Sequence, residues 1–292
     1  LPWAGLFLVG EYHLTWAAVS GMETVLMALL ILLTLQRVDK PGARWEWTGA
    51  LIGLAVWVRP DGVTLLGPAL FALVLGGGSW KQRSAGGLRL LAGFALFFLP
   101  YLLFNLRIQG SLWPNTFYAK QAEYAVLQQR SLFLRLADEL SLPLVGAGML
   151  LAPGFIVLLW RSLGEKRWGL VGAGLWFMGY AGLYAWRLPV TYQYGRYLIP
   201  AMAVFFVLGL AGSARLVRAW GGAKLGRLAG FAFTALLTGV WAGFYLLGAR
   251  NYARDVVIIQ SEMVAAAKWV AANTAPGDLV AAHDIGAMGY FG

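Results

Sequence analysis

The sequence predicts an all-α polytopic membrane protein with about eight membrane-crossing helices, followed by the start of a small extracytoplasmic α/β domain. Three observations support this fold class. The 292-residue chain is 60% hydrophobic and 12% charged, with a mean hydropathy of +0.67, which is far from the values of soluble domains. Apolar runs as long as a membrane span recur along it. Thirteen of the 23 Lys and Arg residues lie in four short loops, so the net charge of +10 indicates topology rather than a nucleic-acid-binding face.

Six apolar runs are long enough to be membrane spans, and they lie at 14–35, 88–106, 143–160, 169–186, 198–214 and 228–248. A seventh apolar stretch, 48–76, is interrupted by "RPDG", where Pro60 and Gly62 mark a break. This stretch is either one long kinked crossing or a hairpin of two short helices. The loops before and after it are both basic, which places both on the same side and favours the hairpin.

The basic loops also predict which side faces the cytoplasm. The positive-inside rule places the loops 36–47, 77–90, 161–168 and 215–227 in the cytoplasm. The unusual polar motifs then all lie on the outer side: Glu23 near the outer end of its helix, "RPDG" at the hairpin tip, "PNTFYAK" at 114–120, "YQYGRYLIP" at 192–200, and the segment from 249 onward. We expect these motifs to form one site.

The C-terminal segment predicts a soluble unit, so we divide the chain into a transmembrane domain, 1–248, and a soluble domain, 249–292. Apolar residues from 256 to 270 recur at helical spacing, and "NTAPGD" ends that helix. "LVAAH" at 279–283 predicts a short strand. The chain begins at Leu1 and ends at "GYFG", and we expect it to be an internal fragment. It has no Cys, which excludes disulfides and thiolate chemistry.

The outer motifs occur in an order that resembles one group of membrane glycosyltransferases. "SGMET" in an early helix, "RPDG" after a short apolar run, "PNTFYAK" in an outer loop, "GRYLIP" before a helix and "DIGAMGYFG" beyond the last span carry the resemblance. The group is the GT-C superfamily, and within it the bacterial proteins related to protein mannosyltransferases, aminoarabinose transferases and mycobacterial terminal arabinofuranosyltransferases. Each motif is weak by itself, whereas their order and common side are more specific.

The resemblance implies a multi-pass protein of a bacterial cytoplasmic membrane that moves a sugar from a polyprenyl-phosphate donor to a glycan, lipid or protein acceptor on the extracytoplasmic side. It also implies that the catalytic acidic residue lies in the first outer loop, which we expect upstream of these residues. Membrane lipid is the surrounding partner, and nucleic acid is not expected. No cofactor is assigned, and a divalent metal is left open.

Six polar residues of the first outer motifs are candidate substrate ligands, and each motif has a structural alternative. Glu23 either lines the site or braces neighbouring helices, because an acid in hydrocarbon is costly. Arg59 either contacts a phosphate or lipid headgroup, or forms a pair with Asp61 at the helix break. Lys120 either lines the donor pocket, with the adjacent Asn115 and Tyr118, or anchors the chain at the interface.

The later motifs supply the remaining candidates. Arg196, beside Tyr194, is the strongest candidate for a phosphate ligand, although aromatic residues are common at membrane interfaces in any case. His283 and Asp284 either bind the acceptor or a metal, or form an ordinary turn. A transporter is the competing function class, because broken helices with charged residues are common in transporters. A purely structural membrane protein would leave the clustering of polar motifs on one side unexplained.

Overall fold

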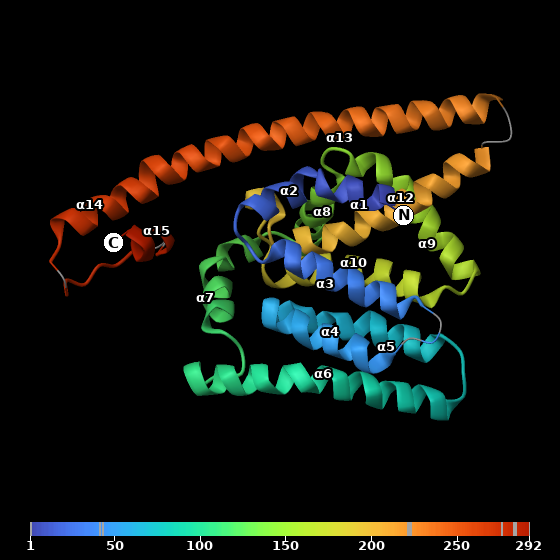
Figure 1. Ribbon diagram of the computed structural model, residues 1–292, viewed down its shortest axis with the longest axis horizontal. Helices are drawn as coiled ribbons and strands as arrows, with labels where there is room; N and C mark the ends of the chain where they lie inside the picture. Colours follow the sequence, from blue (N-terminus) through green and yellow to red (C-terminus); the bar gives the residue numbers. More distant parts are fainter. Residues whose placement is uncertain are drawn as a thin grey trace.

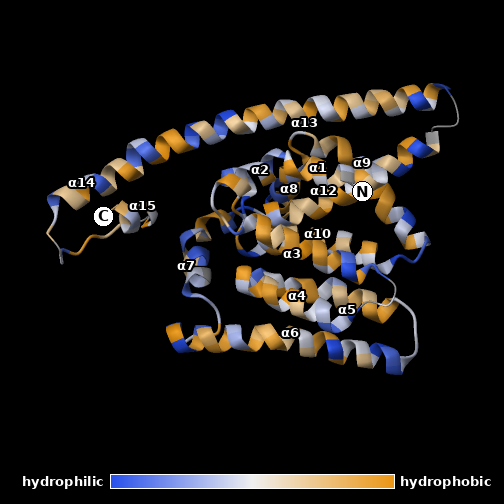
Figure 2. Cartoon of the chain, in the orientation of Figure 1, coloured by the Kyte–Doolittle hydropathy of each residue, from blue (hydrophilic) through white to orange (hydrophobic). Residues whose placement is uncertain are grey.

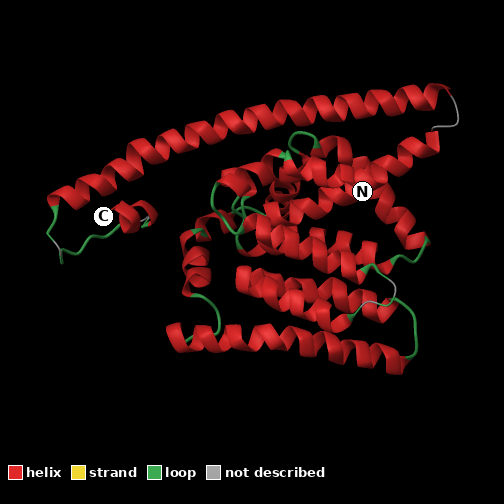
Figure 3. Ribbon diagram, viewed as in Figure 1, coloured by secondary structure: helices red, strands yellow, loops and turns green. Residues whose placement is uncertain are grey.

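The computed structural model describes residues 2–40, 42, 44–220, 224–275, 277–282 and 285–291, and these residues form helices and loops without a strand (Figure 3). The helices in chain order are α1 (Pro2–Val9), α2 (Tyr12–Val19), α3 (Thr24–Val38), α4 (Trp45–Val58), η1 (Pro60–Leu65), α5 (Leu66–Leu75), α6 (Trp80–Gln109), α7 (Asn115–Glu123), η2 (Ala125–Gln129), α8 (Leu132–Ser141), η3 (Leu142–Leu144), α9 (Gly148–Gly164), α10 (Trp168–Arg187), α11 (Tyr192–Gly195), α12 (Ile199–Trp220), α13 (Lys224–Ile258), η4 (Ile259–Val264), α14 (Ala265–Asn273) and α15 (Gly286–Phe291).

The apolar helices pack side by side into a bundle, with α13 along one face of it (Figures 1 and 2). The largest fully buried side chains include Tyr180, Phe177 and Phe206, on α10 and α12. Helices α4 and α6 pack very closely, because a Cβ atom on Gly49 would lie 1.9 Å from the Leu90 carbonyl oxygen. Small residues at such a crossing let two backbones approach each other in a membrane.

Among the described residues, three helices are long and apolar enough to cross a membrane: Trp80–Gln109, Ile199–Ala219 and Lys224–Asn273. The pair Leu132–Leu144 and Gly148–Gly164, bent by 106°, makes a fourth if it counts as one span. This is fewer than the eight predicted crossings. Part of the difference arises because a run of apolar residues in the sequence does not show where the helix is interrupted. For example, the predicted span 14–35 is divided into α2 and α3, and α3, with 15 residues, is only about 22 Å long.

The stretch 48–76 forms a hairpin, as its basic flanks predicted. The chain leaves the α-helical conformation at Arg59, passes through η1, and returns as α5 alongside α4 (Figure 1). Trp45, at the start of α4, and Gly76, directly after α5, line the same cavity, so the two open ends of the hairpin lie together.

The basic loops gather at one end of the bundle. Residues of the connections after α3, α5 and α9 line one cavity, and Arg215 near the end of α12 lies 3.6 Å from Glu165. Helix α7 and the hairpin tip lie at the opposite end (Figure 1). The structure thus confirms that the loops share one end, while the assignment of that end to the cytoplasm stays a prediction.

The C-terminal segment differs from the predicted α/β unit. Helix α13 continues through the π-helical η4 into α14, so the predicted domain boundary at residue 248 lies inside a helix. Helix α14 ends at Asn273, as "NTAPGD" predicted. The strand prediction at 279–283 was wrong for the described residues 279–282, which are irregular. A strand needs a partner strand for its backbone hydrogen bonds, and no described segment supplies one.

Candidate functional site

A buried ion pair at the hairpin tip is the centre of the candidate site. Arg59 donates from Nε to Asp61 Oδ1 at 3.3 Å and from Nη2 to Asp61 Oδ2 at 3.2 Å. The side chains are only 10% and 13% exposed. The structure therefore shows the pair with Asp61, which was one of the two interpretations of Arg59. The contact of Arg59 with a phosphate or lipid headgroup stays a prediction.

The hairpin tip is held in shape by local bonds. Pro60 begins η1, where its missing N–H costs nothing. The Thr64 hydroxyl donates to the Asp61 carbonyl oxygen at 2.7 Å, and Trp176 Nε1 on α10 donates to the same hydroxyl at 3.0 Å. The break in the apolar stretch thus places a charged pair at a fixed position against α10.

Two tyrosines of α10 complete the surroundings of Asp61. Tyr180 and Tyr184 lie one turn apart and both donate from their hydroxyls to Asp61 Oδ2, Tyr180 at 2.5 Å. Arg59 Nη2 also donates to the Tyr184 hydroxyl at 2.9 Å. The Asp61 carboxylate therefore accepts four hydrogen bonds, two from Arg59 and two from the tyrosines.

Three cations surround the ring of Tyr197, which stacks on Tyr184 with ring centroids 5.7 Å apart. The Arg196 guanidinium lies 4.8 Å from the Tyr197 ring centroid, Lys120 Nζ 5.2 Å and the Arg59 guanidinium 5.6 Å. Hairpin tip, outer loop and "GRYLIP" motif, which are far apart in the sequence, therefore meet at one aromatic ring. We call Arg59, Lys120, Arg196 and Tyr197 the cationic cluster.

Two cations of the cationic cluster are available to bind an anion. Glu23 and Asp61 neutralise Arg59, whereas the ion pairs of the described residues do not include Lys120 or Arg196. Arg196 donates from Nη2 to the Tyr197 hydroxyl at 2.8 Å, but its Nε is buried without a hydrogen-bond partner among the described groups. A buried donor without an acceptor is costly, and a phosphate oxygen would satisfy it.

The backbone directly before Arg196 is strained. Gln193, Tyr194 and Gly195 have φ values of 52°, 60° and 69°, so three successive residues are left-handed. This conformation costs about 1–2 kcal/mol for each non-glycine residue, and such strain collects at ligand sites. The strained turn ends α11 and places Arg196 and Tyr197 at the entrance of α12.

Glu23 belongs to the site but not in the expected way. It does not lie inside a membrane helix, because it precedes the first residue of α3, and its side chain is 51% exposed. Its Oε1 lies 3.7 Å from Arg59 Nη1. The cost of a carboxylate in hydrocarbon, from which its role was inferred, therefore does not arise, and the pair with Arg59 explains its position instead.

The other predicted residues are divided between the site and its surroundings. Asn115 and Tyr118 share α7 with Lys120 and are both exposed, and the Asn115 backbone N–H donates to Gln109. Tyr194 lies away from the cationic cluster, since its ring packs edge-on against Tyr12 and Trp16. Burial and the charge of Asp255 raise the pKa of Tyr194, which keeps it neutral. His283 and Asp284 lie outside the described residues.

Sequence reasoning missed the roles of Tyr180, Tyr184 and Tyr197. The signal was present in "GYAGLYAW", where two hydroxyl-bearing residues four apart face one side of an apolar helix and need polar partners. Two further buried carboxylates also escaped notice. Glu11 caps α2 and contacts His13 Nδ1 at 2.7 Å, and Glu139 on α8 is 1% exposed.

The described residues contain no group of three or more His, Asp or Glu side chains that could hold a metal ion. The cationic cluster is instead suited to an anion, with one planar guanidinium and one ammonium available for it. Comparison of the chain with protein-family models, with curated proteins and with solved structures found no match.

Proposed function

We propose that this protein is a membrane glycosyltransferase that takes a sugar from a polyprenyl-phosphate donor and transfers it to an acceptor on the extracytoplasmic face. The observation that carries the proposal is the meeting of Arg59, Lys120 and Arg196 around Tyr197. Phosphate binding follows from that charge. The sugar and the lipid chain come from the resemblance of the motif order, and from helices long and apolar enough to cross a membrane.

Each of the three cations of the cluster has a distinct part in this scheme. Asp61 and the tyrosines of α10 fix Arg59 as a positioned charge. Arg196 binds phosphate oxygens through its fork, and Lys120 adds a point charge. As the sugar leaves, negative charge grows on the departing phosphate, and cations that are already in position stabilise it without reorganisation.

We assign no general base among the described carboxylates. Asp61 accepts hydrogen bonds from Arg59 and both tyrosines, and Glu11 caps α2 and contacts His13, so both have structural duties. Deprotonation of the acceptor requires a carboxylate that can reach it. The resemblance attributes this role to a residue of the first outer loop.

A transfer assay with Arg196 variants tests the proposed function. The full-length protein is supplied with a radiolabelled polyprenyl-phosphate sugar, and product is measured per folded protein. Arg196→Ala should lower the rate about 10²–10³-fold, as removal of a transition-state donor does elsewhere. Arg196→Lys should lower it less, because the charge remains while the fork is lost. Arg187→Ala is the matched control, since Arg187 is exposed and stacks on Trp186.

Two outcomes of this assay would reject the phosphate role. One is normal donor affinity and normal transfer in folded Arg196→Ala. The other is an equal loss in Arg187→Ala, which would indicate a general charge effect.

A transporter is the second candidate, and one observation favours it. The α2/α3 break before Glu23 and the α4/α5 break at Arg59 lie against each other, joined by the 3.7 Å contact between these two residues. Facing helix breaks at a charged site are typical of transporters. Uptake of a lipid-linked or small anionic solute into proteoliposomes, without any sugar transfer, would support this candidate and reject the enzyme.

A further inference from the structure

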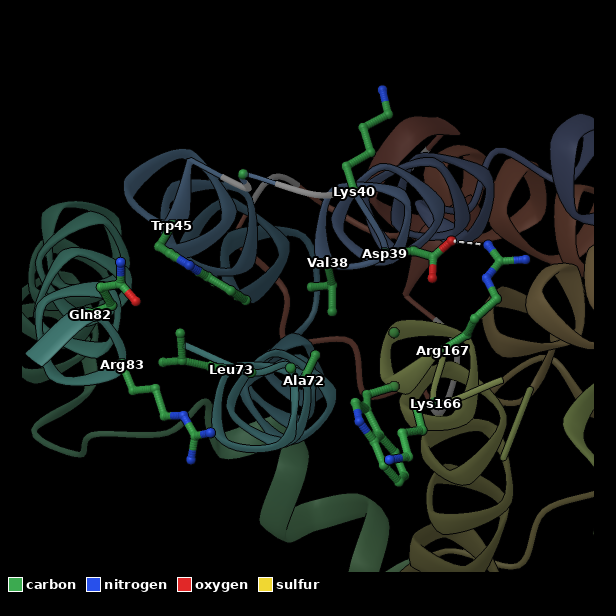
Figure 4. Close-up of a pocket in the computed structure, with 15 residues that line it drawn as sticks. Val38, Asp39, Lys40, Trp45, Ala72, Leu73, Gln82, Arg83, Lys166 and Arg167 are labelled. Carbon is green, nitrogen blue, oxygen red and sulfur yellow. Dashed lines mark hydrogen bonds and ion pairs between the residues drawn. The ribbon is translucent and has the colours of Figure 1, made fainter. Parts of the chain in front are cut away.

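A second cationic region lies at the opposite end of the bundle, where the basic loops gather. It is a cavity of about 630 Å³ between the end of α3, the open ends of the α4/α5 hairpin, the start of α6 and the α9–α10 connection. In Figure 4, Gln82 and Arg83 lie on one side, Lys166 and Arg167 on the other, and Val38 and Ala72 between them. Nothing in the proposed function uses this cavity.

The lining of the cavity is strongly cationic. Lys40, Arg83, Lys166 and Arg167 line it, against the single carboxylate of Asp39. That carboxylate is already paired, because Arg167 Nη2 donates to Asp39 Oδ2 at 2.7 Å. The other three cations are absent from the ion pairs of the described residues. The lining of the cavity, with four cations and one carboxylate, therefore carries a net charge of +3.

Two details indicate that the cations are placed for a ligand. Arg83 Nε is buried without a hydrogen-bond partner among the described groups. Lys166 has a φ of 55°, and it follows the C-cap of α9, a position where glycine is the usual residue. The Lys166 N–H bonds to the Leu163 carbonyl oxygen and the Arg167 N–H to that of Ser162. Lys166, at the wall of the cavity, therefore has a left-handed backbone conformation that is unfavourable for a lysine.

The rest of the lining is apolar and aromatic. Val38, Leu73 and Ala72 form apolar lining, and Trp45 and Trp168 stand at the starts of α4 and α10. Tryptophan at helix ends marks the level of lipid headgroups. A phosphate at the cations with hydrocarbon against the apolar lining matches the two parts of a phospholipid. A soluble phosphate compound would leave the apolar lining exposed.

We propose that this cavity binds the headgroup of an anionic membrane phospholipid between Arg83 on one side and Lys166 on the other. Basic pockets between helices on one side of a membrane bind such headgroups. The site is separate from the cationic cluster at Tyr197 and requires only that the chain is embedded in a membrane. Its loss would leave the charges of that cluster unchanged.

Lipid titration followed by native mass spectrometry tests the site. The purified protein in neutral detergent is titrated with dioleoyl phosphatidylglycerol, with tetraoleoyl cardiolipin and with zwitterionic dioleoyl phosphatidylethanolamine. Both anionic lipids should bind more tightly than the zwitterionic one. Arg83→Ala/Lys166→Ala should weaken phosphatidylglycerol binding roughly 20–30-fold, from the usual contribution of two cations at a membrane surface. Arg218→Ala/Lys224→Ala is the matched control, because it removes two exposed cations outside the cavity lining and should change affinity less than about twofold.

A single substitution separates binding from folding. Lys166→Gly relieves the left-handed strain and removes the cation, so it should raise the melting temperature without lipid while it weakens phosphatidylglycerol binding. Equal losses in the cavity and control variants, or equal affinity for all three lipids, would overturn the proposal. Competition by millimolar glycerol 3-phosphate would show that the ligand is a soluble phosphate compound and would overturn the lipid assignment.

Discussion

Asp61→Asn is the substitution that most directly perturbs the candidate site. Asn keeps the size of the side chain, but it removes the negative charge that compensates Arg59 and turns one acceptor oxygen into a donor. Arg59 Nε, Arg59 Nη2 and the hydroxyls of Tyr180 and Tyr184 all donate to this carboxylate. At least one of these donors would then face another donor.

The expected loss follows from the burial of the pair. Breaking a buried ion pair by removing one partner typically costs about 3–5 kcal/mol. Glu23 lies 3.7 Å from Arg59 and still compensates part of its charge, so the lower end, about 3 kcal/mol, applies. At about 2–4 °C per kcal/mol for a chain of this size, the melting temperature should fall by roughly 6–12 °C.

The assay is thermal unfolding of the purified protein in detergent, followed by gel filtration. Asp39→Asn is the control, because the Asp39 and Arg167 side chains are 24% and 38% exposed and such a pair is worth less than about 1 kcal/mol. Arg59→Met combined with Asp61→Asn should lose less than Asp61→Asn alone, since no lone buried charge remains. A melting temperature of Asp61→Asn equal to that of Asp39→Asn would refute the reasoning.

Two further predictions concern Tyr184 and the topology of the chain. Tyr184→Phe should lower the free energy of unfolding by about 1.5–3 kcal/mol, measured in the same thermal assay, because it removes a hydroxyl bonded to two charged groups. Single cysteines introduced into this Cys-free chain at Gln82 and Tyr118 should react with an impermeant reagent from opposite sides of the membrane, and labelling of both from one side would reject the predicted topology.

The sequence predicted where most helices lie better than where the helices are interrupted. Apolar runs identified most helices, because burial and membrane insertion both require apolar residues. The hairpin at 48–76 was predicted correctly, since charge on both flanks and Pro60 gave independent signals. The break before Glu23 was missed because Ser20 and Gly21 are tolerated within apolar helices and give only a weak stop signal. The strand predicted at 279–283 rested on local β propensity alone, and the described residues contain no second strand to pair with it.

The site could be predicted as a set of motifs but not as an arrangement. Glu23, Arg59, Lys120 and Arg196 were chosen as charged residues near one end of apolar helices, and the structure joins them through Arg59 and Tyr197. Tyr197 could not be identified as the centre, because its role depends on contacts between segments far apart in the chain. The left-handed turn at 193–195 was equally hidden, since Gln and Tyr do not favour that conformation.

The most direct test of the central claim is whether the cationic cluster binds a lipid-linked phosphate. Affinities of the purified protein for a polyprenyl phosphate and for the corresponding polyprenol are compared, with wild type and Lys120→Ala/Arg196→Ala side by side. Wild type should prefer the phosphate by roughly 10-fold or more, in keeping with charge-assisted hydrogen bonds to an anion, and the double variant should lose that preference while still binding the polyprenol. Equal affinity of wild type for both lipids, or an unchanged preference in the double variant, would contradict the account.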